Sequence, residues 1–330
     1  MTNSDLAVHA TGLVKRFGDF VAVGGVDLAV QQGEVYGVLG PNGAGKTTTL
    51  KMLATLLPID GGSASIFGVD VVSAPHQIRQ LVGVTGQYAS VDENLTGREN
   101  LILFGRLLGL SGRQARTTAD ELLESFGLTE AAGRQIKSFS GGMRRRLDLA
   151  ASLIARPPLI FLDEPTTGLD PRTRGQMWDT IRGLVRDGAT VLLTTQYLDE
   201  ADQLADRIAV IDRGLKVAEG TPDELKSSVG DSTLHVRLAD KARTESAARL
   251  VAGVLGEEPV LTPEAGGLNI ALPDANRAAD VLIALRQADL AITTATVRQP
   301  TLDEVFMVLT GHGAEDQNDA TDTHDEEEVA

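Results

Sequence analysis

Short apolar runs alternate with amphipathic stretches along the first two thirds of this sequence. The apolar runs are Val35–Leu39, Leu159–Leu162, Thr190–Thr194 and Ile208–Ile211. Each is short and rich in large apolar residues, as expected for a strand that is buried on both faces. The amphipathic stretches with helical spacing are Thr47–Leu57, Asn94–Gly109 and Gln114–Phe126. This alternation predicts an α/β fold in which helices cover a parallel sheet.

A change in composition near Ser227–Asp231 separates the last third of the chain from the rest. Beyond it, the pattern predicts strands and helices in alternation, at Thr233–Leu238, Arg243–Leu255, Leu268–Leu272, Ala275–Ala288, Ile292–Val297 and Leu302–Leu309. We therefore expect one domain over residues 1–228 and a small α+β accessory domain over residues 231–310. Residues 311–330 are acidic and nearly free of large apolar side chains, so we expect a disordered tail there.

Composition narrows the possible partners and compartments. The 330 residues carry a formal net charge of -16, which argues against a nucleic-acid partner because phosphates would be repelled. The absence of cysteine excludes disulfides and thiolate metal sites. The apolar runs are far shorter than the ~18 residues that a spanning helix needs, and residues 1–18 lack the pattern of a signal peptide. Any membrane role is therefore expected to be peripheral.

A glycine-rich loop after the first apolar run fits the pattern G-x-x-x-x-G-K-[ST]. Its glycines would let backbone N–H groups curl around phosphate oxygens, and the helix that follows would add positive potential. The lysine would reach the β- and γ-phosphates, and the first threonine hydroxyl would ligate Mg²⁺. The candidate phosphate-binding residues are Gly40, Pro41, Asn42, Gly43, Ala44, Gly45, Lys46, Thr47 and Thr48.

Two carboxylates, Asp163 and Glu164, end the apolar run Leu159–Leu162. Ligands of open α/β sheets bind at the carboxyl ends of the strands. Asp163 is suited to hold Mg²⁺, either directly or through water, and Glu164 to polarise an attacking water molecule. In isolation, two carboxylates at this position would be explained equally well as the solvated end of a strand. Next to a phosphate loop, it predicts a hydrolytic site with Lys46 and Glu164 as catalytic residues.

The segment Phe139-Ser140-Gly141-Gly142-Met143 resembles the signature of ATP-binding-cassette (ABC) proteins, usually Leu-Ser-Gly-Gly-Gln. The resemblance runs from about Leu6 to Leu225 and implies a P-loop nucleotide-binding domain with a helical subdomain over about residues 88–150. It implies that Phe17 stacks on the adenine and that Gln87 contacts both Mg²⁺ and a membrane partner. Ser140, Gly141, Gly142 and Asp170 would contact the ATP held by a second copy of the chain. The two copies would then pair head-to-tail around two ATP molecules.

Two positions depart from the usual ABC pattern. Met143 replaces a glutamine, which removes a polar contact. Gln196 stands where the family has its switch histidine, so we expect it to act in hydrolysis by donating a hydrogen bond to the γ-phosphate. A glutamine cannot become cationic, which predicts weaker charge stabilisation and little pH dependence from this side chain.

Further segments, including Thr195-Gln196-Tyr197-Leu198-Asp199-Glu200 and Pro300-Thr301-Leu302-Asp303-Glu304-Val305-Phe306, are similar to the drug-resistance (DrrA) type of ABC proteins. That resemblance implies an ATPase at the cytoplasmic side of the cell membrane. It would drive export of a hydrophobic natural product or a lipid through a separate membrane subunit of the DrrB type. The alternatives are a soluble ABC ATPase acting on nucleic acid or ribosomes, and an importer ATPase. Because stacking on Phe17 would not read base edges, GTP is expected to be accepted beside ATP.

For two groups of residues, the sequence fits more than one role. Arg144, Arg145 and Arg146 could touch a partner or lipid headgroups, but we expect them to form the solvated face of the signature helix. Tyr88, Leu95 and Leu101 fit either a groove for the membrane subunit or the core of the helical subdomain equally well.

Overall fold

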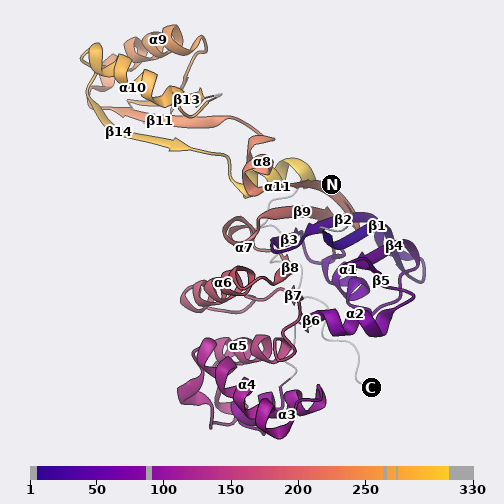
Figure 1. The fold of residues 1–330 in the computed structure, drawn as a ribbon. Coiled ribbons are helices and arrows are strands. Elements are labelled where there is room, and N and C mark those ends of the chain that lie inside the picture. The colour runs from indigo at the N-terminus through magenta and orange to yellow at the C-terminus, as the bar shows by residue number, and fades with distance from the viewer. Residues whose placement is uncertain (1–5, 87–90, 263–265, 273, 312–330) are drawn as a thin grey trace, which may run out of the picture. The chain divides into compact units, whose positions relative to one another are not determined.

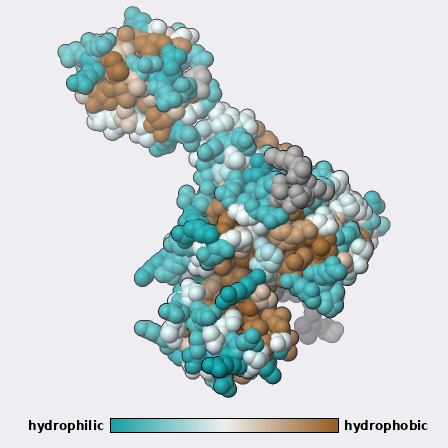
Figure 2. Space-filling view, in the orientation of Figure 1, coloured by the Kyte–Doolittle hydropathy of each residue, from teal (hydrophilic) through white to brown (hydrophobic). Residues whose placement is uncertain are grey.

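The computed structural model describes residues 6–86, 91–262, 266–272 and 274–311. It divides into two compact units, Met1–Pro222 and Asp223–Ala330, and Figure 1 shows the elements of each. Every helix within these described ranges falls short of the length and apolarity that a membrane span requires. On the face seen in Figure 2, hydrophilic and apolar groups are interspersed in both units.

A six-stranded sheet forms the centre of the first unit, with the strand order β10-β9-β3-β8-β7-β6. Its strands are β3 (Val35–Leu39), β6 (Val82–Thr85), β7 (Leu159–Asp163), β8 (Thr190–Thr195), β9 (Arg207–Asp212) and β10 (Leu215–Gly220). All neighbouring pairs are parallel except β10 with β9. Because β3, β8 and β7 are adjacent, the residues that follow these strands meet at one edge of the sheet. The predicted parallel sheet is confirmed.

A second, antiparallel sheet with the order β2-β1-β4-β5 was missed by the sequence analysis. It consists of β1 (Leu6–Phe17), β2 (Phe20–Gln31), β4 (Gly61–Ile66) and β5 (Val69–Asp70). Four register shifts interrupt the pairing of β1 with β2, and such irregularities break the strict alternation of apolar and polar residues by which a half-buried strand is recognised.

The helices of the first unit are α1 (Lys46–Leu53), α2 (Pro75–Leu81), α3 (Gly97–Leu107), α4 (Gly112–Ser125), α5 (Gly141–Ser152), α6 (Pro171–Arg186) and α7 (Leu198–Leu204), with short 3₁₀ turns at Thr129–Ala131 and Ile136–Ser138. Figure 1 shows α3, α4 and α5 together at one end of this unit. Both α3 and α4 begin at a capping box, formed by Thr96 with Glu99 and by Ser111 with Gln114. These caps fix the first turn of each helix, and they explain why α3 starts later than its apolar pattern predicted.

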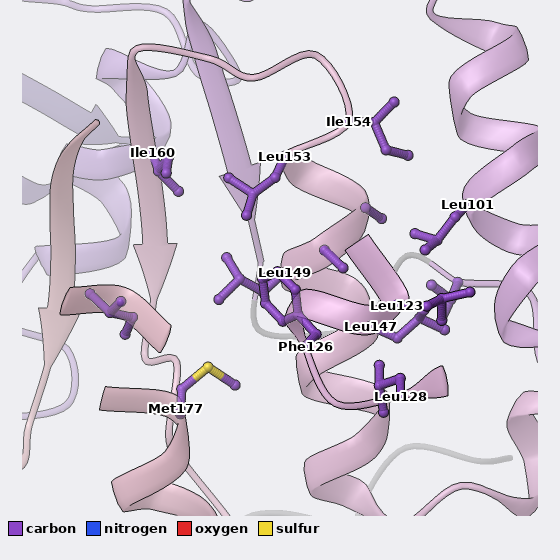
Figure 3. Packing of buried hydrophobic residues seen from close by; sticks show 14 of the residues in the cluster. Leu101, Leu123, Phe126, Leu128, Leu147, Leu149, Leu153, Ile154, Ile160 and Met177 are labelled. Atoms are coloured by element: carbon purple, nitrogen blue, oxygen red, sulfur yellow. The ribbon is translucent and has the colours of Figure 1, made fainter. Parts of the chain in front are cut away.

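The signature helix α5 is anchored by an apolar cluster that reaches from the helical layer to the central sheet. Leu147 of α5 is fully buried, together with Leu123 of α4 and Ile160 of β7, and Figure 3 shows the packing of this cluster. Burying each such side chain contributes about 1.5–3 kcal/mol. Leu101 also belongs to this core, with 1% exposure, so it is not available to line a docking groove.

The second unit is an α+β domain, as expected. Its antiparallel sheet has the order β12-β13-β11-β14, from β11 (Ser232–Leu238), β12 (Val260–Leu261), β13 (Gly267–Leu272) and β14 (Ile292–Arg298). The helices are α8 (Pro222–Ser227), α9 (Thr244–Leu255), α10 (Arg277–Gln287) and α11 (Leu302–Thr310), with a 3₁₀ turn at Lys241–Arg243. The chain order β11-α9-β12-β13-α10-β14 with this strand order is the ferredoxin-like arrangement. Its core joins α9 and α10 to the sheet through residues such as Val236, Val251 and Val281.

Candidate nucleotide-binding site

The glycine-rich loop lies between β3 and α1, where backbone geometry demands glycine. A Cβ on Gly40 would stand 2.1 Å from the carbonyl oxygen of Ile211, and one on Gly45 would stand 2.5 Å from that of Ala22. Gly45 also has a φ of 101° and caps α1 without any side-chain hydrogen bond. No capping side chain therefore accepts a hydrogen bond from the first N–H groups of α1. A helix N-terminus of this kind is suited to bind an anion.

Lys46 is the first residue of α1, and only 4% of it is exposed. Its Nζ donates to the carbonyl oxygens of Gly40 at 2.8 Å and Pro41 at 3.0 Å. The same ammonium lies 3.4 Å from Oε1 of Glu164. Burial lowers the pKa of Lys46, and the nearby carboxylates oppose this shift. The lysine is thus held across the loop with its charge beside the predicted catalytic carboxylate.

Asp163, the last residue of β7, joins two hydroxyl groups at the carboxyl edge of the sheet. Its Oδ1 accepts from Thr47 Oγ1 at 2.8 Å and from Thr194 Oγ1 at 2.6 Å. Thr47 lies on α1 and Thr194 on β8, and Asp163 pairs with Thr194 in the sheet. Three elements therefore bring hard oxygen atoms together next to the loop, and such atoms are the ligands that Mg²⁺ prefers.

Glu164 follows Asp163 in a strained conformation, with a φ of 48°. Its N–H donates to the carbonyl oxygen of Thr194 at 3.1 Å and also lies 3.2 Å from that residue's Oγ1. Its Oε2 accepts from Thr167 Oγ1 at 3.2 Å. A left-handed conformation of a residue other than glycine persists only where its surroundings hold it. The fold thus fixes both the backbone and the carboxylate of Glu164.

A cavity of about 330 Å³ opens over this loop. It is lined by Phe17, Phe20, Ala22, Asn42, Gly43, Ala44, Gly45, Lys46, Thr47, Thr48 and Glu164. Phe20 was missed by the sequence analysis, although it pairs with Phe17 across the β1–β2 hairpin. A second aromatic three residues after Phe17 was the signal that could have revealed it. A larger hollow of about 470 Å³ lies at the amino ends of β7 and β8 and contains none of the predicted site residues.

The predicted signature residues lie outside the lining of that cavity. Ser140 caps α5 by accepting from the N–H of Met143 at 3.3 Å. Asp170 caps α6 by accepting from Thr173 N at 3.0 Å and Oγ1 at 2.6 Å, and these bonds lower the pKa of Asp170. A Cβ on Gly142 would stand 2.3 Å from Cγ2 of Thr173. The starts of α5 and α6 are therefore packed against each other.

Gln196 directly follows β8 and is half-buried. Its strand lies between β3 and β7, so this side chain starts from the same edge of the sheet as the loop and Glu164. Gln87 and Tyr88 lie outside the described residues, and the roles expected of them stay predictions.

The expectation that the three arginines of α5 form a solvated face is wrong, because Arg144, Arg145 and Arg146 are all half-buried. Arg146 donates to the carbonyl oxygens of Phe126 and Gly142, and Arg145 to those of Pro165, Asp163, Glu164 and Gly86. Arg144, with 33% side-chain exposure, pairs with Glu93 at 2.6 Å. Sequence periodicity could not reveal the contacts of Arg145, because their acceptors are all backbone atoms of distant segments.

The fold and the site define a class of protein. Residues 23–167 match the family model described as ABC transporter. A dimeric ATP-binding cassette in a post-hydrolysis state, bound to ADP and Pi, superimposes with a TM-score of 0.59 at 26% identity, covering 65% of this chain and 98% of that one. The fold also matches cbiO1 from Clostridium perfringens, part of the ABC transporter complex cbiONQ, with a TM-score of 0.63 over 68% of this chain and 91% of that one. The chain is an ATP-binding cassette of the ABC class and an ATPase.

Relatives define its family more closely. The chain is 53% identical to the daunorubicin/doxorubicin resistance ATP-binding protein DrrA of Streptomyces peucetius, over 100% of this chain and 99% of that one. It is 44% identical to the doxorubicin resistance ATP-binding protein DrrA of Mycobacterium tuberculosis, over 94% and 95% of the two chains. Residues 220–310 match the model described as ATP-binding protein DrrA1-3-like, C-terminal domain. The chain belongs to the DrrA family of ABC ATP-binding proteins, which confirms the resemblance found in the sequence.

Proposed function

We propose that this chain drives the export of a hydrophobic, drug-like natural product through a separate membrane subunit of the DrrB type, at the cytoplasmic side of the cell membrane. The observation that carries this proposal is the full-length similarity to a daunorubicin/doxorubicin resistance protein, which extends across both structural units. A lipid is the alternative cargo. Export is also named for a second kind of relative, because a Nod factor export ATP-binding protein of Burkholderia lata is 47% identical over 69% of this chain and 75% of its own.

The triphosphate of ATP would lie in the loop between β3 and α1. Lys46 would turn its buried ammonium from the loop carbonyls toward the β- and γ-phosphates. Phe17 and Phe20 would hold the base by stacking, because they are 49% and 63% exposed at the rim of the cavity. Stacking uses the face of the base and tolerates any purine, so we propose that GTP is bound as well as ATP.

The oxygen atoms beside the loop fit Mg²⁺. Thr47 Oγ1 would coordinate it, and Asp163 would hold it directly or through water, since these two oxygens are already 2.8 Å apart. When bound, Mg²⁺ would neutralise charge that develops on the phosphates. Gln87 is a further candidate ligand from the sequence.

Glu164 is proposed as the group that polarises the attacking water. A nucleotide in the loop would compete with Glu164 for the ammonium of Lys46, 3.4 Å away. Engagement of Lys46 by phosphate would leave the carboxylate oxygen available to accept a proton from water. Gln196, at the end of β8, would donate a hydrogen bond to the γ-phosphate.

A second copy of the chain is proposed to complete each site. Ser140, Gly141 and Asp170 are exposed and do not line the cavity of their own chain among the described residues. The capped start of α5 is suited to an anion that another molecule brings to it. A head-to-tail pair would supply that anion twice, as the γ-phosphate of each ATP. Closure of the pair would move the membrane subunits, with the segment around Gln87 as the contact.

A reconstituted system tests the proposal. The chain is co-expressed with each candidate six-helix membrane protein of the same genome, the pair is co-purified and placed in lipid vesicles, and ATP-dependent movement of daunorubicin is followed by fluorescence. We expect transport with the unaltered chain and none with Glu164→Gln. The exporter assignment would be refuted if no membrane subunit associated with the chain, or if its ATPase rate responded to RNA or ribosomes and not to the membrane subunit.

A further inference from the structure

We propose that Arg145 is a positioning residue for ATP hydrolysis, which orients Glu164 and ties its backbone to Gly86, the residue that follows β6. This inference rests on the proposed role of Glu164. It concerns a side chain on the signature helix α5, five residues after Ser140, that does not line the nucleotide cavity.

The guanidinium of Arg145 binds four backbone carbonyls from two strand ends. Its Nη2 donates to Asp163 O at 2.7 Å and Glu164 O at 3.0 Å, and its Nε donates to Pro165 O at 3.1 Å. Its Nη1 donates to the carbonyl oxygen of Gly86. Asp163 ends β7, and Gly86 directly follows the neighbouring strand β6. One planar group thus joins the carboxyl ends of both strands to α5.

These bonds secure the strained peptide of Glu164 from both sides. Its N–H is bound by Thr194 of β8, and its carbonyl is bound by Arg145. The φ of 48° between these two groups would relax if either anchor were lost. Since the side chain leaves from the same Cα, relaxation would swing the carboxylate away from the position fixed by Thr167 and Lys46.

Arginine suits this role in a way that lysine does not. The guanidinium has five N–H donors in a rigid plane, whereas an ammonium is a compact point charge on a flexible stem. A lysine at position 145 would keep the positive charge but could not reach carbonyls on two strands with fixed geometry. The substitution therefore separates the effect of charge from the effect of position.

Arg146 provides a matched control on the same helix. It is also half-buried, and burial lowers its pKa as it does that of Arg145. Its hydrogen bonds go to Phe126 and Gly142, and so they stay within the helical layer and its own helix. A loss of activity that came only from weakening α5 would appear in both Arg145→Lys and Arg146→Lys.

The test uses the full chain and measures kcat and KM for ATP, the Kd for ATP and the melting temperature. We expect Arg145→Lys to lower kcat by about tenfold or more while the Kd stays within about threefold, because the lost contacts orient Glu164 and do not touch nucleotide. Arg146→Lys should keep kcat within about threefold, since it leaves the β7 end intact. In the double variant Arg145→Lys/Glu164→Gln, kcat should fall no further than in Glu164→Gln alone, because both changes disable the same group.

Three results would overturn the inference. They are an unchanged kcat in Arg145→Lys, an equal loss in Arg146→Lys, or a further multiplicative loss in the double variant. If Arg145→Lys melts below the assay temperature, Arg145→Gln is measured by the same criteria. A wild-type chain that binds ATP but never hydrolyses it would refute the proposed function itself, which separates the two outcomes.

Discussion

The loop region and the starts of α5 and α6, the two parts of the proposed catalytic site, differ in how deeply their polar side chains are buried. At the loop, Lys46, Asp163 and Glu164 are 4%, 3% and 7% exposed and belong to one network of hydrogen bonds and an ion pair. At the starts of α5 and α6, Ser140 and Asp170 are exposed, and their side chains cap their own helices.

The difference indicates which part of the chemistry one chain can assemble alone. Buried charges require partners in place when the chain folds, because an unpaired buried charge is costly. An exposed helix N-terminus is stable in water and can take up an anion later. We therefore expect Lys46, Asp163 and Glu164 to form a nucleotide cradle within one chain, and the starts of α5 and α6 (the signature face) to act on the nucleotide of another copy.

The largest expected effect is that of Glu164→Gln, directly after β7. We expect kcat to fall by about 10²–10⁴-fold, the usual contribution of a general base. ATP affinity should be kept or should rise, because the amide no longer competes with phosphate for Lys46. Phosphate release and ATP binding by equilibrium titration check this. A variant that loses binding and turnover together would show that Glu164 mainly shapes the cradle.

Mixed dimers compare the two ends directly. Lys46→Ala should weaken ATP binding by about 10–100-fold, through loss of a charge-assisted hydrogen bond, and Ser140→Ala should keep binding but lose turnover. In a head-to-tail pair of these two chains, both defects fall in one site and the other site is intact. Random mixing should then restore about a quarter of the wild-type rate if the sites act independently.

The matched control mixes Lys46→Ala with Glu164→Gln. Both defects lie in the cradle, so each site of the mixed pair carries one defect and the rate should stay low. Recovery in this control, or none in the mixture with Ser140→Ala, would contradict the division of each site between two chains.

A smaller effect is expected at Gln196, at the end of β8. Gln196→Ala should lower kcat by about 10–100-fold, which corresponds to one hydrogen bond to a charged group. The shape of the pH–rate profile between about pH 6 and 8 should not change, because a glutamine does not titrate. Gln196→His should instead give a rate that rises as the pH falls below about 6.5, where the imidazole gains its charge. An unchanged rate in Gln196→Ala would remove this residue from the mechanism.

The sequence predicted best where local chemistry and structure coincide. The loop Gly40–Lys46 is recognised by the spacing of its glycines and lysine, and the strand that ends at Asp163 by its apolar run. The sequence alone was therefore enough to locate both. The antiparallel sheet of β1 and β2 was missed because its register shifts hide the alternation. Arg145 was misjudged because its partners are backbone carbonyls, whose positions no residue type reveals. Contacts of this kind depend on the tertiary arrangement of strand ends, which periodicity does not encode.

The smallest effect concerns Gly142, where the signature face offers two explanations for one glycine. It could approach a phosphate, or it could simply make room for Thr173, whose Cγ2 would lie 2.3 Å from an added Cβ. Gly142→Ala should therefore destabilise the first unit by about 1–3 kcal/mol, measured as a lower melting temperature. Adding Thr173→Ser removes Cγ2 and keeps the hydroxyl that bonds Asp170, so it should recover most of this stability. If turnover returns with stability, packing explains the glycine. If stability returns and turnover does not, the close approach of the backbone to phosphate is the reason that only glycine serves at this position.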